Sequence, residues 1–370
     1  MSDVGVIFGG PSPEHDVSVL TGLQAARELS GSRAVRAIYW SKAGDWYEVA
    51  GGLEAEAFLD GVPRGATPLR LGTGDGFSAE GGRLGRARPL SLGAVLVCCH
   101  GGPGEDGTLQ GVLDLAGIAY AGPTVAGAAI GMDKLAFSSL MAAAGLPTLP
   151  RVLLEPGTAD VGFAGPYIVK PRFGGSSIGI QVVTDLATAT AQLALNRHLA
   201  GGAVLEPYRS DFFDLQLAVR SWPALELSAI ERPLRTEDQP GGRPEILGYA
   251  DKYVAGEGMA GARRELPATL EVALESRIRR AAEEVARLTQ VRGIARIDFL
   301  SDGHEVVVNE VNTIPGSLAR YLWVEPAIPF GQLLADLLAE AEKRPTHAYS
   351  AAGADGTVLR SAGSIAAKLA

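Results

Sequence analysis

One apolar run constrains the fold more than any other feature of the chain. Residues 94–99 are all apolar and do not alternate with polar residues, which is typical of a strand in a sheet covered by helices on both faces. Residues 4–8 and 35–40 are also predicted strands, and a helix capped by Asp16 or Ser18 and ending near residue 29 connects them. We therefore expect an N-terminal βαβ unit in an α/β (α+β) protein.

Composition limits the classes of function. The chain has 370 residues, 46% of them hydrophobic, which is enough for two or three packed units. Its net charge of −9 argues against a nucleic-acid partner but permits one anionic ligand in a local basic pocket. Adjacent Cys98 and Cys99 predict two buried thiols. The longest apolar run, residues 92–99, is far shorter than the ~20 residues of a membrane span, and no signal peptide stands out, so we expect a cytoplasmic protein without a membrane partner.

Changes in sequence pattern divide the rest of the chain. Residues 51–90 are rich in glycine and arginine and predict loops and edge structure, whereas Asp133 is placed to cap a helix that ends at Gly145. Further strands are predicted at residues 167–169, 203–205, 215–219, 225–230, 293–300 and 305–311, with an amphipathic helix over residues 270–288. We expect domains at residues 1–122, 123–205 and 206–345, followed by an Ala- and Gly-rich tail at residues 346–370.

The last two predicted strands carry a candidate metal site. Arg296 and Asp298 share one face of their strand, and Glu310 and Asn312 share one face of the next. A three-residue hairpin loop would place Asp298 opposite Val308, with Glu310 diagonal to it. Two carboxylates and an amide oxygen are hard ligands that suit Mg²⁺ or Mn²⁺ better than Zn²⁺. The alternative is a solvated hairpin face without a metal.

A glycine-rich loop follows the predicted strand that ends at Lys170. Its glycines, among them Gly175, would let backbone N–H groups approach phosphate oxygens, and the hydroxyls of Ser176 and Ser177 add donors. The loop lacks the Gly-Lys-Ser/Thr ending of a Walker motif. A purely structural turn is one alternative interpretation.

The same loop also matches the Gly-x-Ser-x-Gly pattern of a hydrolase nucleophile elbow, with Ser177 as the nucleophile. Such an enzyme would need a histidine from later in the chain, and the candidates His198, His304 and His347 have no supporting motif.

Two more polar segments follow strands near the N-terminus. His100 begins a glycine-rich turn after the 94–99 strand, where a ligand binds in an open α/β sheet, although a tight turn with a satisfied histidine is equally consistent. Glu14 precedes the first predicted helix. It either complements the helix dipole or serves as the counter-charge of a ligand ammonium group.

In this order, the motifs resemble those of the D-alanine–D-alanine ligases of the ATP-grasp superfamily. The matching stretches span most of residues 4–340 and are residues 8–10, 14–18, 100–111, 132–134, 168–171, 175–179, 252–253, 296–298, 310–313 and 315–316. The resemblance implies an ATP-grasp fold preceded by the βαβ domain. It also implies that ATP activates the carboxylate of one D-alanine as an acyl phosphate, which the amine of a second amino acid attacks to form a dipeptide for peptidoglycan synthesis.

The resemblance implies a nucleotide site with two Mg²⁺ ions held by Asp298, Glu310 and Asn312. The other nucleotide-binding residues would be Lys134, Lys170, Gly175, Ser176, Ser177, Glu206, Asp214 and Lys252. Of these, the three lysines would contact phosphates, Glu206 the adenine amino group and Asp214 the ribose. The spacing between Glu206 and Asp214 is one residue longer than usual in the family.

The resemblance also implies the amino-acid sites. Glu14 would hold the ammonium of the first D-alanine, His100 would steer its carboxylate, and Ser176 and Tyr253 would link the closing loop to Glu14. Arg296 and a backbone N–H near Gly316 would stabilise the oxyanion. The family usually places a small hydroxyl residue nine positions after Asn312, where this chain has Tyr321, followed by Leu322.

This departure leaves two interpretations of the acceptor site open. The Tyr321 hydroxyl would replace the smaller one at longer reach, or its ring and Arg320 would define a different acceptor. The wider alternatives are a ligase with another acceptor or donor, such as D-Ala-D-X, D-Ala-D-lactate or a specialised peptide, a non-catalytic nucleotide-binding protein, and the serine hydrolase. Similar proteins are usually homodimers.

Overall fold

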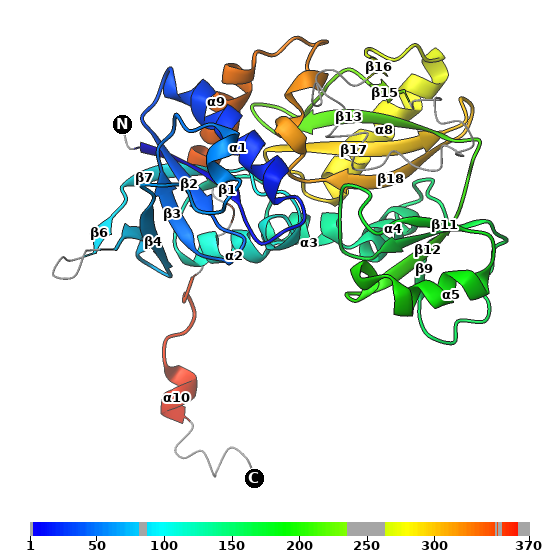
Figure 1. Ribbon diagram of the computed structural model, residues 1–370, viewed down its shortest axis with the longest axis horizontal. Helices are drawn as coiled ribbons and strands as arrows, with labels where there is room; N and C mark the ends of the chain where they lie inside the picture. The colour runs from blue at the N-terminus through cyan, green and yellow to red at the C-terminus, as the bar shows by residue number, and fades with distance from the viewer. Residues whose placement is uncertain (1–2, 81–86, 235–262, 345, 347–349, 362–370) are drawn as a thin grey trace.

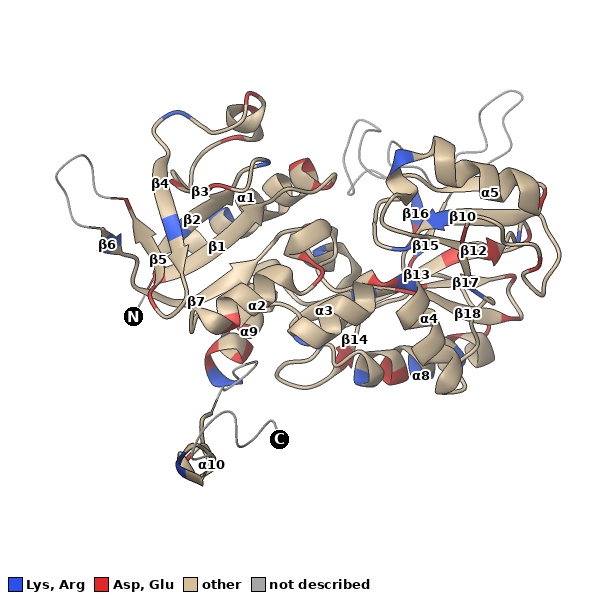
Figure 2. Ribbon diagram, turned by 90° about the horizontal axis from the view of Figure 1, so that it is seen from below, with Lys and Arg blue, Asp and Glu red and all other residues tan. Residues whose placement is uncertain are grey.

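The computed structural model describes residues 3–80, 87–234, 263–344, 346 and 350–361. Within these residues, the strands form one eight-stranded sheet, two four-stranded sheets and a two-stranded ribbon. The eight-stranded sheet lies at one end of the molecule and both four-stranded sheets lie at the other (Figures 1 and 2). None of the helices in the described ranges is long and apolar enough to cross a membrane.

The N-terminal sheet contains the predicted parallel unit. β1 (Asp3–Gly9) lies between β2 (Val35–Trp40) and β7 (Leu92–Val97) and is parallel to both, and β7 also pairs in parallel with β8 (Tyr120–Ala121). The apolar run therefore forms a strand with neighbours on both sides, as predicted. Cys98 and Cys99 follow it as buried free thiols.

The helix between β1 and β2 differs from the prediction at its start. α1 (His15–Ser30) is preceded by Glu14, so neither Asp16 nor Ser18 caps it. The Ser18 hydroxyl instead accepts a hydrogen bond from the Gly9 N–H (2.6 Å) and donates one to the Cys98 carbonyl (2.8 Å). The chain after β1 and the chain after β7 are thereby joined.

Antiparallel strands extend this sheet through a region for which the sequence predicts loops and edge structure. The strands are β3 (Trp46–Val49), β4 (Thr67–Gly72), β5 (Gly76–Ala79) and β6 (Arg88–Pro89), with a 3₁₀ turn η1 (Ala55–Phe58). β4, β5 and β6 form one edge of the sheet, so the predicted edge structure is confirmed, with regular strands in place of part of the expected loops. Leu69 and Phe77 are buried in the N-terminal core, which explains why these short strands form among so many glycines.

The next segments lead from the N-terminal sheet to the first four-stranded sheet. They are η2 (Gly102–Gly104), α2 (Thr108–Leu115), α3 (Val125–Met132) and α4 (Lys134–Ala143). The Asp133 side chain accepts hydrogen bonds from the N–H groups of Leu135 and Ala136, both at 3.1 Å, so the predicted cap of α4 is confirmed.

The first four-stranded sheet has the order β11-β10-β12-β9 and is antiparallel throughout. Its strands are β9 (Val152–Leu154), β10 (Tyr167–Pro171), β11 (Gln181–Val183) and β12 (Ala203–Pro207); α5 (Leu186–Leu195) and η3 (Arg197–Leu199) belong to the same region. The glycine-rich loop connects β10 to β11. Because a strand rather than a helix follows it, the loop lacks the strand–turn–helix context of a nucleophile elbow.

The second four-stranded sheet has the order β14-β13-β17-β18. Its strands are β13 (Phe213–Arg220), β14 (Glu226–Leu227), β17 (Ile294–Ser301) and β18 (Val306–Asn312), and α8 (Val272–Leu288) packs its predicted apolar stripe into their core. The strand predicted at residues 225–230 is thus shortened to β14. The ribbon of β15 (Arg232–Pro233) and β16 (Arg264–Glu265) lies beside this sheet.

The C-terminal segments return to the N-terminal sheet. They are η4 (Gly316–Leu322) and α9 (Phe330–Lys343); the short α10 (Thr357–Ser361) instead lies away from the rest of the fold (Figure 1). Leucines of α9, including Leu333 and Leu337, are buried in the N-terminal core. The start and end of the chain therefore share one core, and the domain boundaries expected from the sequence remain a prediction.

The register of β17 and β18 differs from the one expected. The hairpin loop has four residues, 302–305, instead of the expected three, so Phe299 pairs with Val308. A β-bulge that leaves Asn309 as an extra residue on β18 shifts the pairing once more, and Asp298 pairs with Glu310. Asp298 therefore lies opposite Glu310 rather than Val308, and Arg296 lies opposite Asn312. The bulge places the four polar side chains of the candidate metal site on one face of the hairpin.

Close packing of α1 on β1 gives a stability prediction. A Cβ atom on Gly22 of α1 would lie 2.3 Å from the Phe8 Cβ. We expect Gly22→Ala to lower the free energy of unfolding by about 1–3 kcal/mol through overpacking, despite the better helix propensity of alanine. Gly31→Ala is the matched control, because its Cβ would make only a 3.6 Å contact with the Glu28 carbonyl oxygen. Equal denaturation midpoints for the two variants would contradict this packing argument.

Candidate functional site

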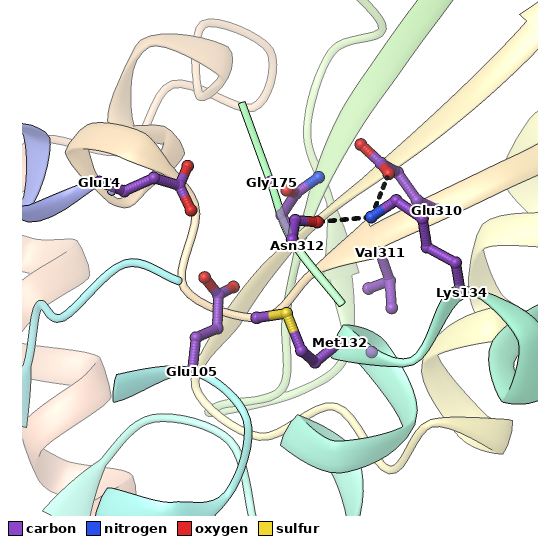
Figure 3. Close-up of a pocket in the computed structure, with 10 residues that line it drawn as sticks. Glu14, Glu105, Met132, Lys134, Gly175, Glu310, Val311 and Asn312 are labelled. Carbon is purple, nitrogen blue, oxygen red and sulfur yellow. Dashed lines mark hydrogen bonds and ion pairs between the residues drawn. The ribbon is translucent and has the colours of Figure 1, made fainter. Parts of the chain in front are cut away.

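A pocket lies where the three larger sheets approach one another. It is lined by Glu14, Glu105, Gly131, Met132, Lys134, Gly174, Gly175, Glu310, Val311 and Asn312. In Figure 3, Glu14 and Glu105 come from the N-terminal part of the chain, and Lys134 and Glu310 approach from the opposite side. Segments far apart in the sequence, several of them singled out from it, therefore line one pocket.

The glycine-rich loop reaches across this pocket to Glu14. The Ser176 hydroxyl donates a short hydrogen bond to the Glu14 carboxylate. Ser176 and Ser177 have positive φ values of 51° and 58°, a conformation that costs a residue other than glycine about 1–2 kcal/mol. A Cβ on Gly175 would lie 2.7 Å from a Glu14 oxygen, so only glycine fits there without displacing the carboxylate.

His100 is buried and links two parts of the site. Its Nδ1 lies 2.6 Å from the Ile314 carbonyl oxygen, and its Nε2 lies 2.8 Å from the Thr21 hydroxyl, which accepts a hydrogen bond from the Ser317 N–H. With a proton on Nδ1, the ring donates to Ile314 and accepts from Thr21. Burial lowers the pKa of His100, which favours this neutral form. The expected contact of His100 with a substrate carboxylate remains a prediction.

Glu105 is a site residue to which the sequence analysis gave no role. Its carboxylate accepts hydrogen bonds from the N–H groups of Gly101 (2.9 Å) and Ile314 (2.8 Å) and from the Thr313 hydroxyl (3.3 Å). It thus ties the turn after β7 to the chain after β18. Burial and the negative charge of Glu14 raise the pKa of Glu105 to about 7. An acidic residue in a glycine-rich turn after a central strand was the available signal.

Basic side chains neutralise the carboxylates of the bulged hairpin. Arg296 donates two hydrogen bonds to Asp298, at 2.7 and 2.8 Å, and the Asn312 amide donates a third at 3.1 Å. The Lys134 ammonium lies 3.4 Å from Glu310 and donates to the Gly174 carbonyl at 2.5 Å. These pairs offset the repulsion between the opposed carboxylates of Asp298 and Glu310.

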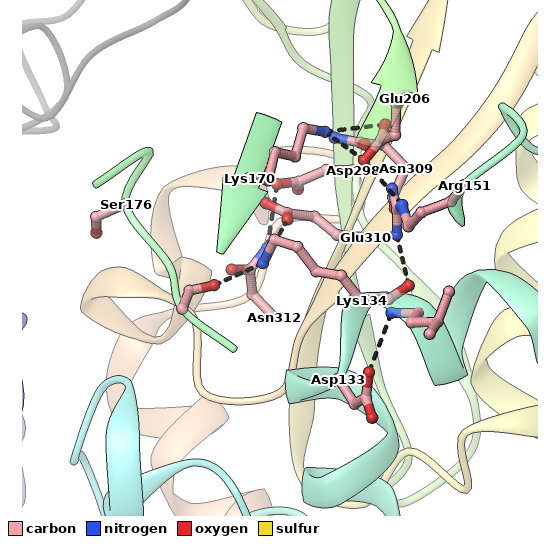
Figure 4. A network of polar contacts seen from close by, with 12 residues as sticks. Asp133, Lys134, Arg151, Lys170, Ser176, Glu206, Asp298, Asn309, Glu310 and Asn312 are labelled. Atoms are coloured by element: carbon pink, nitrogen blue, oxygen red, sulfur yellow. Dashed lines mark hydrogen bonds and ion pairs between the residues drawn. The ribbon is translucent and has the colours of Figure 1, made fainter. Parts of the chain in front are cut away.

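A second cluster, formed by Arg151, Lys170 and Glu206, is more deeply buried (Figure 4). Both Arg151 Nε (2.8 Å) and Lys170 Nζ (3.0 Å) lie close to Oε1 of Glu206. Burial alone would raise the pKa of Glu206, but the two cations outweigh it and hold that pKa below its usual value. Burial lowers the pKa of Lys170. Arg151 belongs to no motif that the sequence analysis singled out.

The donor set fits a hard divalent cation. Asp298, Glu310 and Asn312 project from one face of β17 and β18 and offer only oxygen ligands besides the amide nitrogen. In the described ranges, no group of three or more His, Cys, Asp and Glu side chains is arranged to hold a metal ion. A set of two carboxylates and one amide suits an ion that takes its remaining ligands from phosphate oxygens, as Mg²⁺ does.

The segment expected to bind the acceptor has an unusual backbone. In η4, which begins at Gly316 and ends at Leu322, the residues Ser317, Leu318 and Ala319 have positive φ values of 50°, 51° and 48°. The Tyr321 ring lies 4.9 Å from the Arg264 guanidinium carbon, and its buried hydroxyl lies near Arg296. Burial raises the pKa of Tyr321, so the hydroxyl keeps its proton.

The remaining predicted site residues are Asp214, Lys252 and Tyr253. Asp214 of β13 lies opposite Leu300, on the same face of the sheet as Gln216, which is opposite Asp298. Lys252 and Tyr253 fall outside the described residues, as does His347 of the hydrolase interpretation.

Comparison with known proteins identifies the family. A model described as the D-ala D-ala ligase N-terminus matches residues 3–123, and a model described as the D-ala D-ala ligase C-terminus matches residues 140–339. The chain belongs to the D-alanine–D-alanine ligase family. The family consists of ATP-dependent ligases, so the predicted enzyme class and the predicted use of ATP are confirmed at the level of the family.

Individual relatives agree along nearly the whole chain. A D-alanine–D-alanine ligase of Mycobacterium sp. (strain KMS) is 33% identical, with 93% of this chain and 97% of that protein covered. The crystal structure of the D-alanine–D-alanine ligase from Helicobacter pylori has a TM-score of 0.69 at 25% identity, covering 94% of this chain and 100% of that one. A D-Ala:D-Ser ligase from Enterococcus faecalis has the same fold, with a TM-score of 0.72 at 24% identity and 92% and 99% coverage. The predicted ATP-grasp fold is confirmed.

The raised pKa of Glu105 predicts a pH dependence of stability. The pKa rises from an ordinary value of 4.5 to about 7, so the folded protein retains a proton that the unfolded chain loses between these values. The resulting stabilisation is complete below pH 4.5 and is lost as the pH rises through 7. Over that range the wild type should lose up to about 3 kcal/mol relative to Glu105→Gln, which cannot titrate.

Denaturant unfolding of both proteins at several pH values between about 4.5 and 8 measures this difference. Glu105→Gln also loses stability because a hydrogen-bond acceptor is removed, but that loss does not depend on pH. It therefore cancels when the change of unfolding free energy with pH is compared between the two proteins. A constant difference between the two proteins across the range would contradict a raised pKa at Glu105.

Proposed function

We propose that this protein forms D-alanyl-D-alanine from two D-alanine molecules and ATP, as a step of peptidoglycan precursor synthesis. The observation that carries the proposal is the pocket in which the loop serine Ser176 bonds Glu14 opposite the Lys134–Glu310 pair. A carboxylate suited to an ammonium group and a lysine suited to a phosphate thus line one pocket. Family membership and the curated relatives support the same activity.

The chemistry requires activation of a carboxylate. A free carboxylate is a poor electrophile, so its oxygen first attacks the γ-phosphorus of ATP and ADP leaves. The amine of the second D-alanine then attacks the carbonyl carbon of the acyl phosphate, loses a proton and expels inorganic phosphate. The products are the dipeptide, ADP and phosphate. Water has to be excluded from the site because it would hydrolyse the acyl phosphate.

On the amino-acid side, Glu14 holds the ammonium group of the first D-alanine. Its carboxylate is fixed by Ser176 and lies against Gly101 and Gly175, so a ligand bound to it would contact the loop that closes the site. In the proposal, Tyr253 completes the link from this loop, and His100 steers the substrate carboxylate. Arg296, with a backbone N–H near Gly316, stabilises the oxyanion that forms when the amine attacks.

On the nucleotide side, Lys134 and Lys170 bind phosphate oxygens, and residues 173–179 cover the phosphates with the N–H group of Gly175 and the hydroxyls of Ser176 and Ser177. Lys252 approaches the γ-phosphate when the site closes. Glu206 and Asp214 bind the adenine amino group and the ribose. Two Mg²⁺ ions, held by Asp298, Glu310 and Asn312, would neutralise the charge of the triphosphate.

A different acceptor or donor is the alternative, and the observation that favours it lies at Tyr321. The large Tyr321 ring stands where the family usually has a small hydroxyl residue, the Arg264 guanidinium lies over that ring, and Leu322 follows on the same turn. Arg320, the arginine first expected to define the acceptor, is exposed and lies over the Phe330 ring. D-Serine, D-lactate and other amino or hydroxy acids are therefore candidate acceptors. We further propose that the enzyme is cytoplasmic, where ATP is supplied, and forms a homodimer, which light scattering would test.

The direct test is incubation with ATP, Mg²⁺ and D-alanine, followed by measurement of ADP and dipeptide. Equal amounts of ADP and D-alanyl-D-alanine are expected. If the protein binds ATP but does not convert it to ADP with any substrate tested, it would instead be a non-catalytic nucleotide-binding protein. A screen of amino and hydroxy acids for phosphate release then distinguishes the D-alanine ligase from a ligase with another acceptor or donor. Strong stimulation of phosphate release only by an acceptor other than D-alanine would replace the D-alanyl-D-alanine assignment with that alternative.

A carboxylate variant tests the metal assignment. Glu310→Gln should abolish turnover and leave the melting temperature near that of the wild type, because the amide keeps the size of the side chain but loses the charge that holds a cation. Glu305→Gln, on the exposed turn beside β18, is the matched control and should keep wild-type activity. Near-normal turnover by Glu310→Gln would remove Glu310 from the metal site.

A further inference from the structure

We propose that Arg151 is a positioning residue of the nucleotide site, which shares the Glu206 carboxylate with Lys170 so that this carboxylate does not neutralise the Lys170 ammonium alone and the ammonium can bind a nucleotide phosphate. This inference rests on the proposed ATP site and deepens it. Arg151 lies just before β9, outside every motif singled out in the sequence, and its side chain is only 3% exposed.

Arg151 contacts three segments that carry predicted nucleotide or metal residues. Its Nε donates to the Glu206 carboxylate at 2.8 Å, its Nη1 to the Lys134 carbonyl at 2.7 Å, and its Nη2 to the Asn309 carbonyl at 3.3 Å. Figure 4 shows these contacts converging from α4, β12 and β18 on one guanidinium group. A planar group with donors in a fixed fork is suited to such a junction.

The charges of the buried cluster do not cancel. Arg151 and Lys170 bring two positive charges, and Glu206 brings one negative charge, with side chains exposed by 3%, 8% and 1% respectively. If only Lys170 faced Glu206, the two would form a neutral pair, and a phosphate would have to compete with the carboxylate for the ammonium. The Glu310 carboxylate also acts on Lys170, but Glu310 is paired with Lys134, so with Arg151 present the wider group of three cations and two carboxylates carries one excess positive charge. Such a charge is costly to bury without a counter-ion, and an anionic ligand would supply one.

The two carbonyl contacts give Arg151 its position relative to the rest of the site. Lys134 is the first residue of α4, and Asn309 is the extra residue of the bulge that sets Glu310 opposite Asp298. The same guanidinium group therefore fixes the backbone at Lys134, the other predicted phosphate-binding lysine, and the backbone next to the candidate metal ligand Glu310. Loss of these contacts would affect nucleotide binding before it affected the amino-acid side, which Arg151 does not contact.

Arg292 provides a matched control for a purely structural arginine. It is also buried, and it donates to the carbonyls of Tyr120, Gly122 and Arg344. None of these residues lines the pocket. Replacing Arg292 therefore removes a buried arginine and three carbonyl contacts without touching the nucleotide residues.

The experiment compares the full-length wild type with Arg151→Met, Arg151→Lys and Arg292→Met. The dissociation constant of ATP with Mg²⁺ is measured without amino acids, together with the KM for D-alanine and the melting temperature. We expect Arg151→Met to weaken ATP binding about tenfold or more with a KM for D-alanine within about twofold of wild type. Arg151→Lys, which keeps the charge, should restore ATP binding to within about threefold, and Arg292→Met should lower only the melting temperature.

Two results would overturn the role of Arg151: ATP binding by Arg151→Met within twofold of wild type, or equal weakening in Arg292→Met. If Arg151→Met does not fold, Arg151→Lys decides alone, because a tenfold weakening in that variant contradicts a role based on charge. Failure of the proposed function is distinguished by the wild type itself, which would then bind ATP without producing dipeptide.

Discussion

The opposition of two carboxylates across the β17–β18 hairpin is the constraint on which the site depends. The bulge at Asn309 sets Asp298 directly opposite Glu310, an arrangement of like charges that destabilises a sheet unless cations offset it. Arg296 and Lys134 supply those cations in the described structure. In the proposed function, a divalent ion between the carboxylates would take over the role of these two cations.

The site forms only where the three larger sheets meet, and buried polar contacts join these sheets to one another. Glu105 and His100 join the turn after β7 to Ile314 in the chain after β18, and Thr21 extends the link from α1 to Ser317. Arg151 joins the first four-stranded sheet to the hairpin through the bulge itself. The residues that position the site thus lie at the junctions between sheets, where each contacts a segment that follows or precedes a strand of a different sheet.

The sequence predicted those features that depend on local pattern. The apolar run gave the parallel strand β7, the period of three and four gave α8, and Asp133 capped α4 as expected. The four-residue hairpin loop and the bulge at Asn309 together moved the partner of Asp298 from Val308 to Glu310, and neither was predicted because no local residue type marks them. Arg151 was missed because its partners lie 55 residues away at Glu206 and 158 residues away at Asn309. The role of a single charged residue cannot be predicted from sequence when its partners are brought close only by folding.

A crystal structure with ADP and Mn²⁺ tests the central claim most directly, because the anomalous signal of manganese locates the ion. The account predicts anomalous density among Asp298, Glu310, Asn312 and the phosphates, with Lys134 and Arg296 moved away from the carboxylates. Density elsewhere, or a nucleotide bound while both ion pairs of the hairpin remain intact, would contradict it.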